Sequence, residues 1–458
     1  MRPISRVRFN ALAGYCRASL PAVFQEFAWF EHANERVLGI VVRARGDNDF
    51  GASVLGRDRR GRFRAIYTTG FESSSRRARV LLRREIERLA LASEEEYYQG
   101  DEIGAPLDFF QPRVPKDRLD TKFLHLAEHP GEIAARRIIE PMMHWYEDPD
   151  GNFIEQFQTT AFDARLWELY LFAAFREMGY AIDRAQAVPD FTCEGVLGQF
   201  AVEAATVNPT RDKTNTVVPP PSHDTPETLL EFQRHYMPIK FGSSLTSKLS
   251  KEYWKKPNVE GLPLLFAIQD FSAPASMTYT RAALPTYLYG YEHAWEKDSD
   301  GRLHVYPRKI ATHRYGNKEI PSGFFFLPGA ENVSAVIANT SATISKFNRM
   351  GVVAGFGSRR VHLVRHGFRL NHDPDATEPI PFVLRVDDPD YTETWVEGLD
   401  VYHNPRAKIP LDPEMLPGAA HYVLSPEGQI EHDAPDWHPL ASRTDIYSAE
   451  EEPRTKSP

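Results

Sequence analysis

Three isolated carboxylates stand in otherwise apolar stretches of this sequence. Glu168 is the only charged residue in "LWELYLFAAF", Glu203 is the only one in "QFAVEAATV", and Asp190 lies between a proline and an apolar segment. A buried carboxylate is costly unless a cation, hydrogen-bond donors or a proton compensate it. Three such groups together predict a shared cation. Carboxylate oxygens favour Mg²⁺ or Mn²⁺, which usually retain waters and meet a substrate phosphate, so the chemistry predicted is phosphodiester hydrolysis.

The elements that must position these carboxylates can be read from periodicity and turn residues. A helix is expected over 162–178, ended by Gly179, and it carries Glu168. Short strands are expected at "VPDFTC" and "QFAVEAATV", on either side of a glycine-containing turn at 195–198. A second helix over 243–256 and an apolar strand over 262–271 follow. The predicted order is therefore helix, strands, helix, strand.

In this order the residues resemble the PD-(D/E)xK nuclease superfamily, the fold of many restriction endonucleases. The resemblance covers roughly residues 160–270, with Glu168 on the first helix, Pro189-Asp190 at the second strand and Glu203 on the third. It implies a central mixed sheet of αβββαβ type and a DNA- or RNA-cleaving endonuclease. It also implies that Glu168, Asp190 and Glu203 are catalytic, that Asp190 and Glu203 bind Mg²⁺ or Mn²⁺, and that the biological role is restriction or antiviral (phage) defence.

One position departs from the family pattern, because Ala205 stands where these nucleases carry a lysine. That lysine orients or activates the attacking water and balances charge on the phosphate. The helix over 243–256 offers several lysines, and its apolar stripe runs through Leu245, Leu249 and Tyr253. Lys248 flanks this stripe, so Lys248 is the candidate for a relocated catalytic lysine. The alternative is an ordinary solvated helix lysine.

The densest basic segment lies further along the chain and is predicted to contact substrate phosphates. Its residues are Lys346, Arg349, Arg359, Arg360 and Arg365. A solvated protein surface is the alternative. The "LVRHG" motif in the same segment is similar to the nucleophile motif of histidine phosphatases. In that family the motif opens an α/β domain, whereas a turn-rich stretch follows here, so the sequence argues against a phosphatase.

Length and composition limit the remaining possibilities. The chain has 458 residues, which predicts two or three domains. We expect an α+β N-terminal domain (1–130), a nuclease-like domain with an insertion (131–350) and a Pro/His-rich C-terminal region (351–458). The two cysteines cannot form a disulfide framework, and no Cys/His spacing is typical of zinc.

The expected class of protein is a multidomain, α/β and α+β, cytoplasmic enzyme whose partner is nucleic acid. No apolar run is long enough to span a membrane, and the net charge of −9 argues against bulk electrostatic coating of nucleic acid. The rival hypothesis is a catalytically inactive nuclease-like module that binds nucleic acid or protein. The sequence leaves the oligomeric state open, and a homodimer is compatible with it.

Overall fold

The computed structural model describes residues 1–16, 23–102, 104, 108–146, 148, 151–183, 186 and 188–448. Over these residues, none of the helices combines the length and the apolar character that crossing a bilayer requires. As predicted from the sequence, helices are mixed with several sheets, one of which is large and mixed in strand direction.

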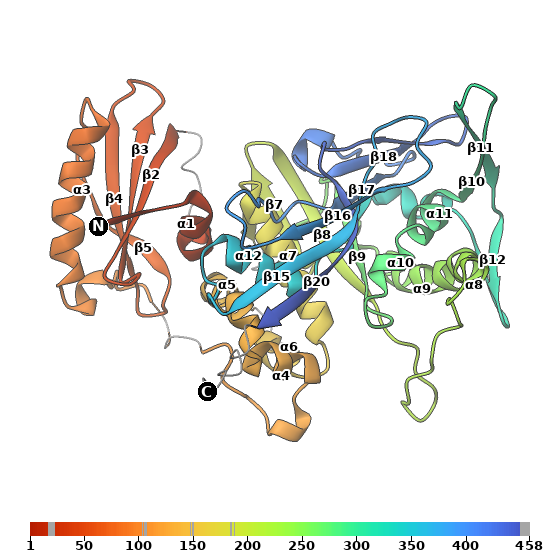
Figure 1. Cartoon of the computed structure of the whole chain (residues 1–458), viewed down its shortest axis with the longest axis horizontal. Coiled ribbons are helices and arrows are strands. Elements are labelled where there is room, and N and C mark those ends of the chain that lie inside the picture. Colours follow the sequence, from red (N-terminus) through yellow and green to blue (C-terminus); the bar gives the residue numbers. More distant parts are fainter. Residues whose placement is uncertain are drawn as a thin grey trace, which may run out of the picture.

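The N-terminal part is an antiparallel five-stranded sheet with strands in sequential order (Figure 1). The strands are β1 (Arg2–Ile4), β2 (Phe24–His32), β3 (Val37–Ala44), β4 (Phe50–Arg57) and β5 (Phe63–Thr68). Helix α3 (Ser75–Ala90) covers the outer face, and α1 (Arg6–Ala13) lies toward the rest of the molecule. Gly39 lets α3 approach closely, since a Cβ there would lie 3.0 Å from Leu82. Helix α3 ends at Ala90, and a 3₁₀ turn (Glu94–Tyr97) follows.

A helical segment connects this sheet to the central one. Its helices are α4 (Thr121–Glu128), α5 (Ile133–Trp145), α6 (Phe153–Gln158) and α7 (Phe162–Glu177). Helix α7 is buried along its length, as its apolar sequence predicts, and the indole of Trp167 donates a hydrogen bond to the Ala267 carbonyl (3.1 Å). This contact fixes α7 against one face of the central sheet.

The central sheet has eight strands in the order β19-β18-β17-β14-β9-β8-β7-β6. Strands β8, β9 and β14 are mutually parallel, and the outer strands β6 and β7 run antiparallel. The bounds are β6 (Ala181–Asp183), β7 (Phe191–Gly195), β8 (Gly198–Val207), β9 (Leu264–Asp270), β14 (Ala335–Asn339), β17 (Leu399–His403), β18 (Ala420–Leu424) and β19 (Ile430–Asp433). Between β8 and β9 the chain forms α8 (Pro226–Glu231) and α9 (Met237–Leu249).

The insertion expected before β14 forms two short helices and two hairpins. These are α10 (Met277–Thr280), α11 (Ala283–Tyr289), β10 (Tyr291–Lys297) with β11 (Leu303–Lys309), and β12 (Thr312–Tyr315) with β13 (Lys318–Pro321). They lie at the end of the molecule opposite the N-terminal sheet (Figure 1).

The boundary expected at residue 350 is not a structural boundary. Strands β17, β18 and β19 belong to the central sheet although they follow this position. The remaining C-terminal strands, β15 (Val361–Arg369), β16 (Ile380–Arg385) and β20 (Pro439–Ser448), form a separate antiparallel sheet after α12 (Ile344–Val353). The "LVRHG" motif lies within β15 of this sheet, so no α/β domain opens at it.

Candidate active site

A cavity of about 520 Å³ lies beside β8, at the point where β7 stops pairing with that strand. Strand β7 pairs with β8 only as far as Phe191 opposite Val202, whereas β8 continues to Val207 paired with β9 alone. Asp190, the residue just before β7, accepts a hydrogen bond from the Ala204 amide through Oδ2 (2.8 Å). Beyond this contact, one edge of β8 is open and borders the cavity.

Helices from both faces of the sheet complete the cavity wall. Helix α7 contributes Arg165 and Glu168, and α9 contributes Lys248 and a row of hydroxyls. These hydroxyls are Ser243, Ser244 and Ser247. The alternation of β8 explains the arrangement: Val202 and Ala204 pack in the core that contains α7, while Ala201 and Ala205 pack in the core that contains α9.

Glu203 is buried on the α9 side of β8 and has two partners. The Lys248 ammonium lies 2.6 Å from Oε1, and the Tyr253 hydroxyl donates to the same oxygen at 2.7 Å. The Glu203 side chain is 7% exposed and the Lys248 side chain is 23% exposed. Both contacts fall on Oε1.

Glu168 is held from the other side. Arg165 contacts both of its oxygens through Nη1 (2.7 and 2.9 Å), and the Tyr146 hydroxyl donates to Oε2 (2.9 Å). Gln156 accepts from Nε of the same guanidinium (3.0 Å). Glu168 therefore has an arginine partner, as a structural residue would, but the pair lines the cavity instead of the outer surface.

The three carboxylates influence one another electrostatically. Burial raises the pKa of Asp190 well above its usual value, and the negative charges of Glu168 and Glu203 raise it further. Lys248 acts in the opposite direction. The structure thus brings Glu168, Asp190, Glu203 and Lys248 into one charged cluster, and we call these residues with Arg165 the open cluster.

The residues of the open cluster can be tested against the cation expected from the sequence. The described part of the chain contains no group of three or more His, Cys, Asp or Glu placed to hold a metal ion. Mg²⁺ often binds through only one or two protein carboxylates and retains water in the other positions. Asp190 and Glu203 fit that smaller requirement: Asp190 lines the cavity, Glu203 is buried beside it, and burial with the charges of Glu168 and Glu203 disfavours the ionised form of Asp190, which a cation would stabilise.

The residues of the basic segment expected to contact phosphates fall into a buried group and an exposed group. Lys346, Arg349 and Arg365 are fully buried, which corrects the prediction that they form a phosphate-binding surface. Arg359 and Arg360 are exposed in the turn before β15. Only these two residues are available for the predicted contact.

The buried members of this segment form a second cluster with two carboxylates. Lys346 lies 2.8 Å from Glu393, and Arg349 binds the same carboxylate through two hydrogen bonds of 2.9 and 2.8 Å. Arg365 lies 2.6 Å from Glu397. We call these five residues the closed cluster, and their mutual pairing is the physical reason that the phosphate prediction is wrong for three of them.

Two residues of the site were not predicted from the sequence. Arg165 lies one position before the apolar run that contains Glu168. Residues three apart on a helix are neighbours, so this spacing could have predicted the Arg165–Glu168 pair. The sequence predicts Tyr253 only as part of the apolar stripe of a helix over 243–256, whereas α9 ends at Leu249 and Tyr253 begins a 3₁₀ turn (Tyr253–Lys255). A buried tyrosine hydroxyl usually needs a partner, and here that partner is Glu203.

Comparisons with protein-family models, with curated proteins and with solved structures found no match to this chain. Its function must therefore be inferred from the site geometry and from the order of the elements around it.

Proposed function

We propose that this protein is a metal-dependent nuclease that hydrolyses phosphodiester bonds in DNA or RNA. The observation that carries the proposal is that Asp190 and Lys248 line one cavity at the open edge of β8, and that Lys248 is paired there with the buried Glu203. The order α7-β6-β7-β8-α9-β9 supports it, since this is the αβββαβ order of restriction-endonuclease-like nucleases.

Asp190 and Glu203 are the residues that would hold a Mg²⁺ or Mn²⁺ ion. Such an ion, when bound, lowers the pKa of a coordinated water and neutralises charge on the phosphate. The protein contributes two carboxylates from neighbouring strands, with Asp190 fixed by the Ala204 amide and Glu203 fixed by Tyr253. Because these contacts leave little rotational freedom, the carboxylates are held in place before substrate binds.

Lys248 supplies the positive charge that Ala205 cannot. The family pattern places a lysine two residues after the glutamate on the same strand, whereas here the ammonium reaches Glu203 from helix α9. In the substrate complex, its N–H groups would donate to a phosphate oxygen and stabilise the charge that develops there. The serine hydroxyls of α9 line the same cavity and can donate to the neighbouring substrate atoms.

Glu168 is assigned a positioning role in this proposal. It holds the Arg165 guanidinium at the cavity wall, with Tyr146 fixing the second carboxylate oxygen. Burial acts to lower the pKa of Arg165, but the Glu168 carboxylate offsets this effect and the pKa is raised overall. Arg165 therefore remains charged and can meet a phosphate oxygen on the side of the cavity opposite Lys248.

A catalytically inactive binding module is the second candidate. The observation that favours it is the Lys248–Glu203 ion pair, which already neutralises one of the two carboxylates proposed for the cation. A role in restriction or phage defence rests on the family resemblance and belongs to the nuclease proposal only.

Cleavage assays separate these candidates. The purified protein is incubated with supercoiled plasmid, single-stranded DNA and RNA, with Mg²⁺, Mn²⁺ or EDTA. The proposal expects cleavage that EDTA abolishes, and Lys248→Met lowers its rate by about 100-fold or more. The matched control is Lys251→Met, an exposed lysine outside the cavity, which leaves the rate unchanged. Binding of nucleic acid without cleavage under any of these conditions would favour the inactive module.

A further inference from the structure

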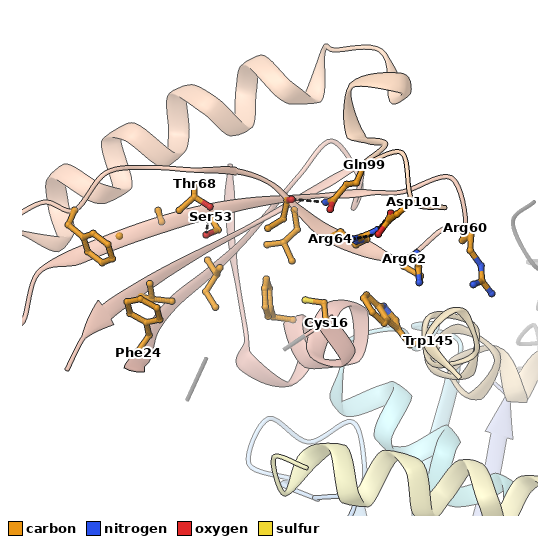
Figure 2. Close-up of a pocket in the computed structure, with 18 residues that line it drawn as sticks. Cys16, Phe24, Ser53, Arg60, Arg62, Arg64, Thr68, Gln99, Asp101 and Trp145 are labelled. Atoms are coloured by element: carbon orange, nitrogen blue, oxygen red, sulfur yellow. Dashed lines mark hydrogen bonds and ion pairs between the residues drawn. The ribbon is translucent and has the colours of Figure 1, made fainter. Parts of the chain in front are cut away.

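A second and larger cavity, of about 670 Å³, lies on the face of the N-terminal sheet that α3 does not cover (Figure 2). Helix α5 closes one end of this N-terminal cavity with Trp145. Small-molecule sites typically have volumes of about 300–1,000 Å³ and apolar walls with a few polar groups. The N-terminal cavity has that size, so its chemical character can indicate a ligand class.

The wall of the N-terminal cavity is mainly apolar and aromatic. Its largest apolar members are Phe9, Phe24, Ile40, Val42, Leu55 and Phe71. The rings of Phe24 and Phe71 stack with their centroids 5.9 Å apart. Phe24 lies at the end of the cavity opposite Trp145 (Figure 2). This wall favours a flat or apolar body, which would lie between the aromatic ends.

Positive charge gathers at the Trp145 end. Arg60, Arg62 and Arg64 line this end, and Asp101 is the acidic residue among them (Figure 2). Asp101 binds Arg64 through two hydrogen bonds of 2.5 and 3.0 Å. Arg60 has neither an ion pair nor a side-chain hydrogen bond to the described residues. Arg62 pairs with the buried Asp58 (2.7 Å), so among the described residues at this end Arg60 is the guanidinium left to bind a phosphate through paired N–H donors.

We propose that the N-terminal cavity binds a nucleoside phosphate, with the base against the aromatic wall and the phosphate at the Arg60 end. The Trp145 indole forms part of the wall at that end. Its Nε1 is buried without a hydrogen-bond partner among the described residues. Buried donors without partners are uncommon, but this one has no accessible surface toward the cavity, so a ligand reaches it only if the indole turns.

The same end of the cavity is connected to the open cluster through two consecutive residues. The Arg62 guanidinium lies over the Trp145 ring, 5.2 Å from its centroid, and Trp145 is the last residue of α5. The next residue, Tyr146, donates the hydrogen bond to Glu168. A ligand that shifts Arg62 or Trp145 thus changes the support of Glu168. This coupling rests on the proposed nuclease function, whereas nucleotide binding does not.

Binding is tested without reference to cleavage. The probes are AMP, GMP, CMP and UMP, with adenosine and inorganic phosphate as separate arms, and binding is measured by calorimetry and by the shift in melting temperature. At least one monophosphate binds the wild type more tightly than adenosine or phosphate does. Arg60→Ala weakens that binding at least fivefold. Arg59→Ala, the matched control, leaves it unchanged because Arg59 stacks on Tyr98 outside the cavity wall.

Absence of binding by all four monophosphates would overturn the nucleotide site, and so would unchanged binding in both Arg60→Ala and Arg62→Ala. Coupling is tested with the monophosphate that binds. It changes the wild-type cleavage rate at least fivefold, and Tyr146→Phe reduces this ratio while retaining nucleotide binding. An unaltered rate at saturating nucleotide would overturn the coupling alone. Absence of cleavage in every condition would count against the proposed function and leave the binding result standing.

Discussion

The open and closed clusters contain similar residues in opposite surroundings. The open cluster has three carboxylates with Arg165 and Lys248 and borders a cavity. The closed cluster has three cations with Glu393 and Glu397, and its lysine and two arginines are almost completely excluded from solvent. Burial of charge is common to both, so burial alone does not indicate function. What distinguishes the open cluster is an excess of carboxyl groups over cations, next to a space that a cation and a substrate can enter.

Charge compensation explains why the closed cluster is structural. Burial acts to raise the pKa of Glu393, but Arg349, Lys346 and Arg365 together hold it well below its usual value. The Tyr391 hydroxyl donates a further hydrogen bond to Glu393 (2.6 Å), and the Thr394 carbonyl accepts one from the Lys346 ammonium (2.6 Å). The network joins α12 to β15 and to the segment before β17, which is a packing role.

The largest effect is expected on breaking the closed cluster. Glu393→Gln leaves buried cations without their counter-charge, and the loss of one partner from a buried ion pair costs about 3–5 kcal/mol. We therefore expect a strongly lowered free energy of unfolding, measured by urea denaturation. Glu203→Gln, in the open cluster, is the comparison and costs less than half as much, because its ion-pair partner Lys248 borders a cavity in which solvent can reach the ammonium. Equal losses in the two variants would remove the distinction between the clusters.

The second prediction concerns activity with the fold preserved. Lys248→Met removes the ammonium and keeps much of the stem, so the free energy of unfolding falls by about 1–3 kcal/mol as buried Glu203 loses its partner, while cleavage falls by about 100-fold. Circular dichroism melting and plasmid cleavage on the same preparation give both values. A variant that cleaves at the wild-type rate would exclude Lys248 from the chemistry.

The pH dependence of stability tests the effect of burial at another carboxylate, Glu132. Glu132 is 4% exposed, its nearest ion-pair partner is His125 at 3.3 Å, and burial raises its pKa to about 7. The folded state then holds a proton that the unfolded chain releases near pH 4.5, so stability falls as the pH rises between about 4.5 and 7. Glu132→Gln removes this loss and raises the free energy of unfolding by about 1–3 kcal/mol above pH 7. The gain disappears below pH 4.5. A gain that is the same at pH 4 and pH 8 would contradict the assignment.

The smallest effect is expected at the exposed arginines. Arg359→Ala with Arg360→Ala weakens nucleic-acid binding by a few-fold at low salt and leaves stability unchanged, since each exposed phosphate contact adds a salt-dependent increment. Fluorescence anisotropy at two salt concentrations measures this change. If affinity and its salt dependence are both unaltered, Arg359 and Arg360 do not contact phosphates either, and the prediction is wrong for the whole segment.

The sequence predicted the open cluster better than its surroundings. Glu168, Asp190 and Glu203 could be found because each is a lone charge in an apolar segment, and Lys248 because it flanks the buried stripe of α9. The local pairing of Arg165 with Glu168 was also within reach of helix spacing. These signals are all short-range, and they concern segments whose periodicity is clear.

Long-range pairing explains what was missed. The partners of Lys346 and Arg349 lie at Glu393, in a segment without regular structure, so the sequence gives no sign that these cations are buried. Likewise, β17 enters the central sheet beside β14 after a separate sheet has begun at β15. The position of a strand in a sheet depends on such distant contacts, and local patterns do not contain them.

Metal binding to the open cluster tests the central claim most directly. Mn²⁺ is titrated by calorimetry into the wild type, into Asp190→Asn and into Glu397→Gln, a variant of the closed cluster. The account predicts one Mn²⁺ site per chain in the wild type, its loss in Asp190→Asn, and its retention in Glu397→Gln if that variant remains folded by circular dichroism. No Mn²⁺ binding by the folded wild type, or equal binding by Asp190→Asn, would contradict the claim that the open cluster is completed by a cation.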